Sequence, residues 1–135
     1  MEKTAIEDEI KDRFNHLVSA LNRKDAGAWS GYYSREQFVS AIAGTDYYEA
    51  RTAWVDSITN YFSMRESQHV NPVAVRVTAL TSDMALMTSE EMSEMQMKNG
   101  DHIKSKHVFT MIWKKEQDRW NILHSHESWL DDPAG

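Results

Sequence analysis

Residues 84–115 read MALMTSEEMSEMQMKNGDHIKSKHVFTMIWKK, and the pair Asn99-Gly100 inside this stretch is the strongest hairpin signal in the chain. Asn-Gly readily supplies the positive φ angles that a tight hairpin turn requires. Long extended segments, 83–98 and 102–115, lie on either side of the pair. Strands of this length twist and curve strongly, so the stretch predicts one strongly curved β-hairpin.

Two further segments extend this hairpin into a meander. Residues 69–80 alternate apolar and other side chains, with Val73, Val75 and Val77 on one side. Residues 119–129 follow the short connection Glu116-Gln117-Asp118. Alternation with a period of two is typical of a half-buried strand. The second half of the chain therefore predicts four consecutive antiparallel strands.

The N-terminal segment has the pattern of an amphipathic helix. Thr4 and Glu7 fit a capping box, in which each side chain binds the other residue's backbone amide. One apolar stripe of period 3.6 follows, at Ile6, Ile10, Phe14, Leu17, Val18 and Leu21. We expect this helix to end near Lys24 and Asp25 to cap a short second helix that presents Trp29, Tyr32 and Tyr33.

A third helix is expected after a short strand. Residues 38–44 are too short and too β-branched for an independent helix and predict that strand or a turn. Thr45-Asp46 fits the start of a long helix, with Glu49 at the acidic third position. Its apolar face would be Tyr47, Ala50, Trp54, Ile58, Tyr61 and Phe62. Helices followed by an antiparallel meander are typical of the α+β class.

Composition limits the functions that need to be considered. The 135 residues predict a single domain over 1–130 with a loose tail at 131–135. The net charge of −6 argues against a nucleic-acid or anionic-membrane partner, and the absence of cysteine removes thiol chemistry and disulfides. The acidic N-terminus has no apolar signal region and no run is long enough to span a membrane, which favours a cytoplasmic protein. Glycine-rich phosphate loops and GxSxG motifs are also missing.

Three segments resemble a known superfamily. Ala20-Leu21-Asn22-Arg23-Lys24-Asp25-Ala26, with Trp29 and Tyr33, is similar to the junction of the first two helices in SnoaL-like proteins of the nuclear transport factor 2-like (ketosteroid-isomerase-like) superfamily. Thr110-Met111-Ile112-Trp113-Lys114-Lys115 and Trp120-Asn121-Ile122-Leu123-His124-Ser125-His126-Glu127-Ser128 resemble its last two strands. The second of these is most similar to the association domain of calcium/calmodulin-dependent kinase II.

This resemblance implies a cone-shaped, cystatin-like fold, in which a curved antiparallel sheet wraps around the N-terminal helices. It also implies a homodimer or larger ring packed through the sheet face. The superfamily contains isomerases, cyclases and dehydratases as well as non-enzymatic binding and assembly modules, so the fold alone does not decide the function. Arginines line the cavity of the kinase domain, and their positions correspond here to Glu91, Met111 and Glu127. That difference argues against an anionic ligand.

Strand parity predicts which side chains share a face, because residues i and i+2 of a strand point the same way. In the second extended segment one face carries Ser89, Glu91, Ser93 and Met95, and in the third it carries Ser105, His107, Phe109, Met111 and Trp113. In the last segment, Leu123, Ser125, Glu127 and Trp129 would share one face, and Trp120, Ile122, His124 and His126 the other.

The candidate catalytic residues are Glu91, His107 and Glu127. Two carboxylates in a dry pocket cannot both ionise easily, so one of them would be a general acid or base. Imidazole is the side chain whose ordinary pKa lies closest to neutrality, which suits proton transfer. The alternatives are ion pairs of the two glutamates with Lys104, Lys106 or Arg76, and an imidazole that only packs.

His124-Ser125-His126 places two imidazoles on one strand face, a spacing that could hold a metal with a third ligand. The available third ligands, His107 and Glu127, have the opposite parity. The superfamily resemblance instead implies histidines bonded across the sheet or at a dimer face. The sequence therefore predicts no metal site and no cofactor.

The remaining site prediction is a binding pocket for a small hydrophobic molecule. Its candidate walls are Trp29, Tyr33, Tyr47, Trp54, Phe109 and Met111, for which ordinary core packing is the alternative. The residues that ketosteroid isomerase needs are not matched here. We therefore expect a SnoaL-like protein that carries out a different proton transfer, as an isomerase, cyclase or dehydratase. The alternative is a non-enzymatic association or ligand-binding module.

Overall fold

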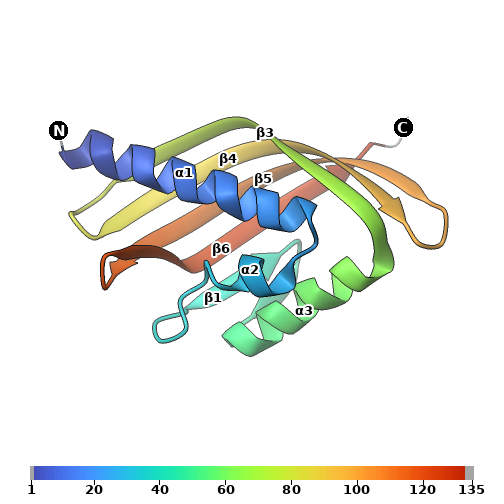
Figure 1. Cartoon of the computed structure of the whole chain (residues 1–135), viewed down its shortest axis with the longest axis horizontal. Coiled ribbons are helices and arrows are strands. Elements are labelled where there is room, and N and C mark those ends of the chain that lie inside the picture. Colours follow the sequence, from blue (N-terminus) through green and yellow to red (C-terminus); the bar gives the residue numbers. More distant parts are fainter. Residues whose placement is uncertain (1, 133–135) are drawn as a thin grey trace.

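The computed structural model describes residues 2–132, which form helices and strands in the predicted α+β order (Figure 1). The elements are α1 (Glu2–Asn22), α2 (Ala26–Ser30), β1 (Ser40–Ala43), β2 (Asp46–Tyr48), α3 (Arg51–Met64), β3 (Arg65–Ala79), β4 (Met84–Met97), β5 (His102–Glu116) and β6 (Arg119–Asp131). The sheet has six strands in the order β2-β1-β6-β5-β4-β3. The predicted fold class is therefore confirmed.

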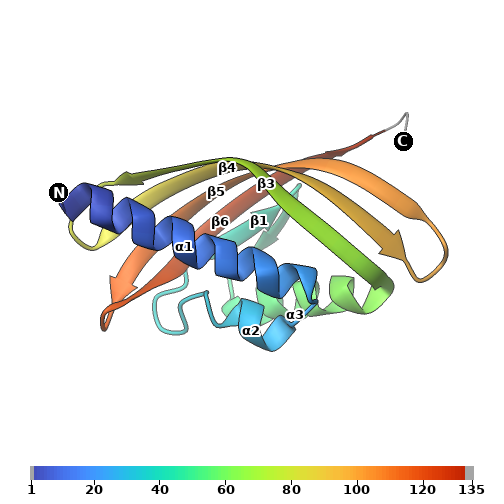
Figure 2. The ribbon, with the colours of Figure 1, turned by 45° about the horizontal axis from the view of Figure 1, so that its top comes forward.

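The sheet is strongly curved and arches over the helices without closing into a barrel (Figure 2). All three described helices lie under the arch, on its concave side, and α1 packs against β3. The convex side carries no element of residues 2–132. This arrangement gives the sheet a covered inner face and an uncovered outer face.

The turn residues and the alternating patterns predict the four-stranded antiparallel meander correctly. β3, β4, β5 and β6 pair antiparallel in sequence order. Gly100 has a φ of 100° in the turn between β4 and β5, as expected for the Asn-Gly pair. The turn between β5 and β6 has positive φ at both Gln117 and Asp118, at 52° and 67°. Two turns of fixed geometry therefore set the register of the three central strands.

Helix α1 ends where the sequence predicts but begins earlier. Lys24 has a φ of 54°, its amide binds Leu21 O, and the Asp25 amide binds Ala20 O, which together form a Schellman motif. Asp25 then caps α2, because its Oδ1 accepts the Ala28 amide at 3.0 Å. The predicted capping box at Thr4 is wrong, since the helix already begins at Glu2 and nothing in residues 2–4 breaks it.

The prediction that Asp46 caps a long helix is also wrong. Residues 46–48 form β2, which pairs antiparallel with β1 through a tight turn at Gly44-Thr45. Gly44 has a φ of 64°, a conformation that favours glycine. Strand β1 in turn pairs in parallel with β6. This long-range pairing holds residues 46–48 extended, and α3 begins only at Arg51.

Strand β6 contains a bulge that corrects the predicted parity. Ile112 pairs with His124 but Trp113 pairs with Ile122, so Leu123 is an extra residue in β6. Because of this extra residue, Trp120 and Ile122 lie on the same concave face as Ser125 and are fully buried. The prediction that they share a face with His124 is wrong.

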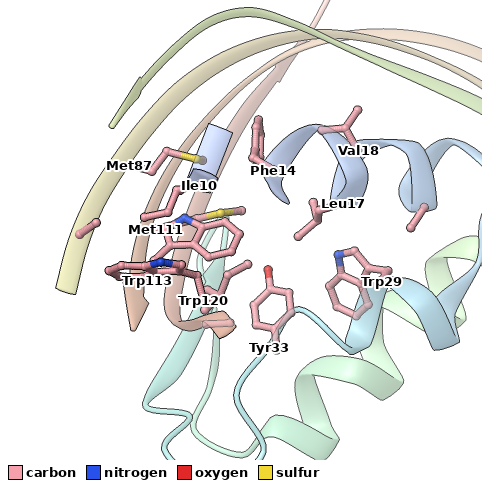
Figure 3. Close-up of a cluster of buried hydrophobic side chains, with 14 of the residues drawn as sticks. Ile10, Phe14, Leu17, Val18, Trp29, Tyr33, Met87, Met111, Trp113 and Trp120 are labelled. Atoms are coloured by element: carbon pink, nitrogen blue, oxygen red, sulfur yellow. The ribbon is translucent and has the colours of Figure 1, made fainter. Parts of the chain in front are cut away.

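The hydrophobic core occupies one half of the concave face (Figure 3). Ile10, Phe14 and Leu17 of α1 pack there against the sheet side chains Met87, Met111, Trp113, Trp120 and Ile122. The other halves of β4 and β5 extend beyond the C-terminal end of α1 (Figure 1). The packed core therefore fills one end of the arch.

The structure bears on the expected absence of a membrane span and on the predicted C-terminal tail. No helix within residues 2–132 is long and apolar enough to cross a bilayer. Strand β6 runs to Asp131, and residues 133–135 of the predicted tail lie outside the described residues.

Candidate functional site

A cavity of about 250 Å³ lies between the concave face of the sheet and the helices. It is bordered by the junction of α3 and β3, by the far halves of β4 and β5, and by the end of β6. Its walls are mostly apolar and aromatic, and the polar side chains among them include Arg65, Gln68, His107, Glu127 and Asp131. An apolar cavity with a few convergent polar groups is the usual form of a small-molecule site.

The structure brings five of the six predicted wall residues to this cavity. Trp29, Tyr33, Trp54, Phe109 and Met111 all line it. The first three pack against one another in tilted and edge-to-face arrangements, with ring centroids 5.0 to 6.0 Å apart. Tyr47 is not among the lining residues and is 61% exposed, because it belongs to β2 rather than to a helix. Whether a ligand binds against these walls stays a prediction.

The predicted catalytic residues meet through the register of the sheet. Glu91 of β4 lies directly opposite His107 of β5, and His107 lies opposite Trp129 of β6. In the next row, Phe109 lies opposite Glu127. Directly opposed side chains on one face are about 4.5–5.5 Å apart at Cβ, and diagonal neighbours are still within reach of long side chains. Glu91, His107 and Glu127 are therefore three neighbours on the concave face.

His107 is held between two aromatic rings and faces a carboxylate. Its ring stacks on Phe109 and on Trp129, at centroid distances of 6.2 and 6.1 Å. Nδ1 lies 3.8 Å from Glu127 Oε2, and both side chains are more than four-fifths buried. Nε2 is buried and has no hydrogen-bond partner. The carboxylate favours a proton on Nδ1, which leaves Nε2 able to accept another.

Glu91 is fully buried, and neither of its carboxyl oxygens has a hydrogen-bond partner. Burial raises the pKa of Glu91 to about 7. The Ser89 hydroxyl opposes this shift without reaching hydrogen-bond geometry, and the negative charges of Glu127 and Glu90 add to it. Glu91 therefore gains or loses its proton near neutral pH.

The geometry argues against the alternative in which Glu91 and Glu127 form ordinary ion pairs with lysine or arginine. Lys104 lies 3.8 Å from Glu94, and Lys106 lies 3.0 Å from Glu90. Both pairs are on the convex face, whereas Glu91 and Glu127 point to the concave side. Within residues 2–132, no lysine or arginine reaches either glutamate at ion-pair distance, and Glu127 is paired only with His107.

Arg65 is the polar group of the cavity that sequence reasoning missed. It is the first residue of β3, immediately after α3, and its backbone turns its side chain into the cavity. Its Nη1 donates to Gln68 Oε1 at 2.5 Å, while its Nε is buried with no acceptor. Burial lowers the pKa of Arg65, and the charge of Glu127 partly restores it. No residue pattern around position 65 marks this placement.

Tyr33 is a neutral member of the wall. Its hydroxyl donates to Ser125 Oγ at 3.3 Å. Burial raises the pKa of Tyr33 above its ordinary value. The phenol therefore stays protonated at any physiological pH, and its proton is already directed at a protein group.

The two histidines of β6 do not converge. His124 Nδ1 lies 2.9 Å from Ser40 Oγ and 3.0 Å from Ser40 O, so it bonds across to β1. His126 is exposed on the convex face. Within residues 2–132, no group of three or more His, Asp or Glu side chains could hold a metal ion. The cross-sheet role that the resemblance implied is confirmed for His124.

Comparison with known sequences gives one family. A family model described as a SnoaL-like domain matches residues 10–132. No protein with a curated description matches the sequence.

Solved structures repeat the same fold at low identity. A nuclear transport factor 2-like superfamily protein from Salmonella enterica serovar Typhimurium has a TM-score of 0.84 and 13% identity, over 93% of this chain and 91% of that one. A candidate dehydratase of the nuclear transport factor 2-like family from Streptomyces avermitilis has a TM-score of 0.79 and 17% identity, over 91% of this chain and 95% of that one. A candidate calcium/calmodulin-dependent protein kinase II association domain from Xanthomonas campestris has a TM-score of 0.78 and 15% identity, over 90% of this chain and 86% of that one. At such identities the likeness shows the fold alone.

Proposed function

Since the chain belongs to the SnoaL-like domain family, we propose that it is a proton-transfer enzyme that acts on a small hydrophobic molecule held in the concave cavity. The observation that carries this proposal is the contact between His107 and Glu127, made at the wall of an apolar cavity and beside a second carboxyl, that of Glu91, which has no partner. Proton transfer needs a base, a group that orients it and the exclusion of water.

The reaction that these groups fit is removal of a proton from carbon beside a carbonyl. The C–H bond breaks, the proton passes to the imidazole of His107, and the electron pair moves into the carbonyl to give an enolate. Return of the proton to another carbon completes an isomerisation, whereas departure of a leaving group completes an elimination. Both outcomes use the same first step and need no other reactant.

Glu127 and Glu91 have different parts in this proposal. Glu127 faces Nδ1 of His107 and stabilises the imidazolium that forms when the ring accepts a proton. Glu91 does not line the cavity, so we assign it a positioning role behind the imidazole. Below neutral pH its neutral form avoids a second negative charge beside Glu127.

Exchange of the α-protons of 2-tetralone in D2O, followed by NMR, tests the proposed function. We expect the protein to accelerate exchange above the buffer rate, and Glu127→Gln to reduce the acceleration by about 10- to 100-fold because the imidazolium loses its partner. Glu66→Gln is the matched control, since Glu66 is exposed on β3. Buffer-level exchange with the wild-type protein would refute the proposal.

The uncovered outer face supports a second candidate, an association module. Met92, Val108 and Leu130 are 49%, 45% and 72% exposed there, on three adjacent strands. The pair Lys106–Glu90 lies among them, so the face combines apolar side chains with both signs of charge. Such a surface can be complementary to itself in a twofold dimer. We therefore propose a second copy of this chain as its partner.

Light scattering during size-exclusion chromatography tests this association. We expect the wild-type chain to elute as a dimer and Val108→Glu to elute as a monomer, because a buried carboxylate would oppose the paired faces. Leu80→Glu is the matched control, since Leu80 is 54% exposed but lies at the β3–β4 turn. A wild-type monomer at all protein concentrations, or monomers from both variants alike, would contradict a dimer through this face.

A further inference from the structure

We propose that a polar groove outside the concave cavity binds a phosphate group between the guanidinium groups of Arg35 and Arg119. The groove has a volume of about 600 Å³ and lies between the loop of residues 31–37 and the turn that joins β5 to β6. Tyr33 is the one described residue that lines both the groove and the cavity. The inference therefore goes beyond the proposed function and does not depend on it.

The two arginines of the groove are open to a ligand. Arg35 and Arg119 are exposed, both line the groove, and neither guanidinium makes a hydrogen bond or an ion pair within residues 2–132. Burial lowers the pKa of Arg51, and the charge of Arg35 adds to this shift. Burial likewise lowers the pKa of Arg13, with the charge of Arg119 as the next cause, although Glu9 opposes the shift. Each free guanidinium thus lies near a second cation, and a bound anion would relieve the repulsion.

The carboxylates of the groove do not supply that anion. Glu116 Oε2 accepts hydrogen bonds from Ser34 Oγ at 3.0 Å and from Gln37 Nε2 at 2.5 Å. Its Oε1 accepts from Asn121 Nδ2 at 2.8 Å. Glu36 is exposed, and no lysine or arginine of the described chain lies within ion-pair distance of it. Glu116 is therefore committed to neutral donors, and both arginines remain available to an anion from solution.

Fixed contacts hold the walls of the groove in place. The hydrogen bonds of Glu116 join the end of β5 to the loop of residues 31–37. On the other side of this loop, Arg51 of α3 donates from Nε to Tyr33 O at 3.2 Å and from Nη2 to Ser30 O at 2.6 Å. The backbone around the groove is therefore ordered before a ligand arrives, which lowers the entropic cost of binding.

The turn at the edge of the groove has an unusual backbone. Gln117 and Asp118 both have positive φ, at 52° and 67°, where Asn and Gly are the favoured residues. Gln117 lines the groove, and its side-chain amide makes no hydrogen bond within residues 2–132. Residues in sparsely populated conformations gather at binding sites, because the side chain that they present is needed there. Gln117 thus adds a free hydrogen-bond donor to the two arginines.

A phosphate group fits this donor set better than a carboxylate does. The planar fork of a guanidinium matches two oxygens of either group. A carboxylate has only two oxygens, so one guanidinium occupies it fully. A phosphate monoester has three terminal oxygens and a charge of about −1.5 to −2 at neutral pH, so it can bind two guanidinium groups at once. The ligand class is therefore a phosphate group, either free or carried by a small molecule.

Titration of the isotope-labelled full chain with inorganic phosphate, phenyl phosphate and acetate, followed by NMR at constant ionic strength, tests this site. We expect phosphate to cause saturable shifts in the amides of residues 34–37 and 116–121, and acetate to bind at least about tenfold more weakly. Arg35→Gln and Arg119→Gln should each weaken phosphate binding at least about tenfold, as expected for the loss of a charged donor. Arg76→Gln is the matched control, since Arg76 is exposed on β3 outside the groove. Thermal unfolding checks that each variant is folded.

Shifts that spread over the whole surface, or that persist unchanged in both groove variants, would overturn the site, because phosphate would then only screen the charge of the protein. Acetate binding as tight as phosphate binding would overturn the assignment to phosphate. Equal affinities for inorganic and phenyl phosphate would support recognition of the phosphate group alone, and tighter binding of phenyl phosphate would support a phosphate carried by a larger molecule. Proton exchange at His107 is measured separately, so failure here leaves the proposed function standing.

Discussion

Replacement of His107 by glutamine is expected to lower the rate of α-proton exchange of 2-tetralone by about 10²- to 10⁴-fold, the usual contribution of a positioned general base. Glutamine has nearly the same reach and can still face Glu127, but it cannot accept a proton at this pH. Within residues 2–132, no protein group occupies Nε2 as a hydrogen-bond partner, so that nitrogen is not already committed to another contact. Initial exchange rates measured by NMR, at equal concentrations of folded protein, give the comparison.

A histidine on the same strand provides the control. His102 is at the start of β5 and about half exposed, and it faces Glu94 at 3.6 Å in a similar pairing of imidazole and carboxylate. His102→Gln should leave exchange unchanged. If His107→Gln kept most of the wild-type rate, the imidazole would not be the base, and the carboxylates that line the cavity, Glu127 and Asp131, would be the remaining candidates among the described residues.

The convergence of Glu91, His107 and Glu127 on one face follows from local rules. The turns at Asn99-Gly100 and Gln117-Asp118 are short, so they set the register of β4, β5 and β6 within narrow limits. Strand parity then decides which side chains share a face. Local turn signals and alternation were both readable in the sequence, which explains why this part of the candidate site could be predicted.

Asp46 and Leu123 show where local rules fail. The residues after Gly44 have the composition of a helix start, but β1 is held by a parallel pairing with β6 more than 80 positions away. Leu123 is an ordinary strand residue in a regular pattern, and its bulge is known only from the pairing of β5 with β6. Both depend on long-range contacts, which the pattern of neighbouring residues does not contain.

Two residues of the candidate site are predicted incorrectly: Tyr47 does not line the cavity, and Arg65 lines it without having been predicted. The helical pattern places Tyr47 at the cavity, but the helix begins only at Arg51. Arg65 stands at the change from helix to strand, where neither the helical nor the strand period predicts a direction. Aromatic residues inside well-formed elements, such as Trp54 and Phe109, were placed at the cavity correctly.

Replacement of Glu91 by glutamine is expected to remove a loss of about 3 kcal/mol in the free energy of unfolding, which the wild-type chain undergoes between pH 4.5 and pH 8. Burial raises the pKa of Glu91 from its ordinary value of 4.5 to about 7 in the folded chain. Below pH 4.5 the carboxyl is protonated in both states and contributes no difference. Between pH 4.5 and 7 the unfolded chain loses its proton first, so stability falls as pH rises, and the full loss of about 3 kcal/mol is present above pH 7.

Glutamine cannot ionise, so the Glu91→Gln variant lacks this loss. The amide has its own cost of burial, which does not change with pH; the informative quantity is therefore the difference between wild type and variant at pH 4.5 and at pH 8. Urea unfolding at both pH values measures it. Relative to the wild type, the variant should gain about 3 kcal/mol between the two conditions.

Glu90→Gln is the matched control, because Glu90 is the adjacent residue on the opposite face and pairs with Lys106 in partly exposed surroundings. Its difference from wild type should change by less than about 1 kcal/mol over the same range. A pH-independent difference for Glu91→Gln would mean that this carboxyl ionises in the folded chain as freely as in the unfolded one. The buried, unpartnered state of Glu91 would then be incorrect. The reason for assigning Glu91 a neutral, positioning role beside the His107–Glu127 pair would be lost with it.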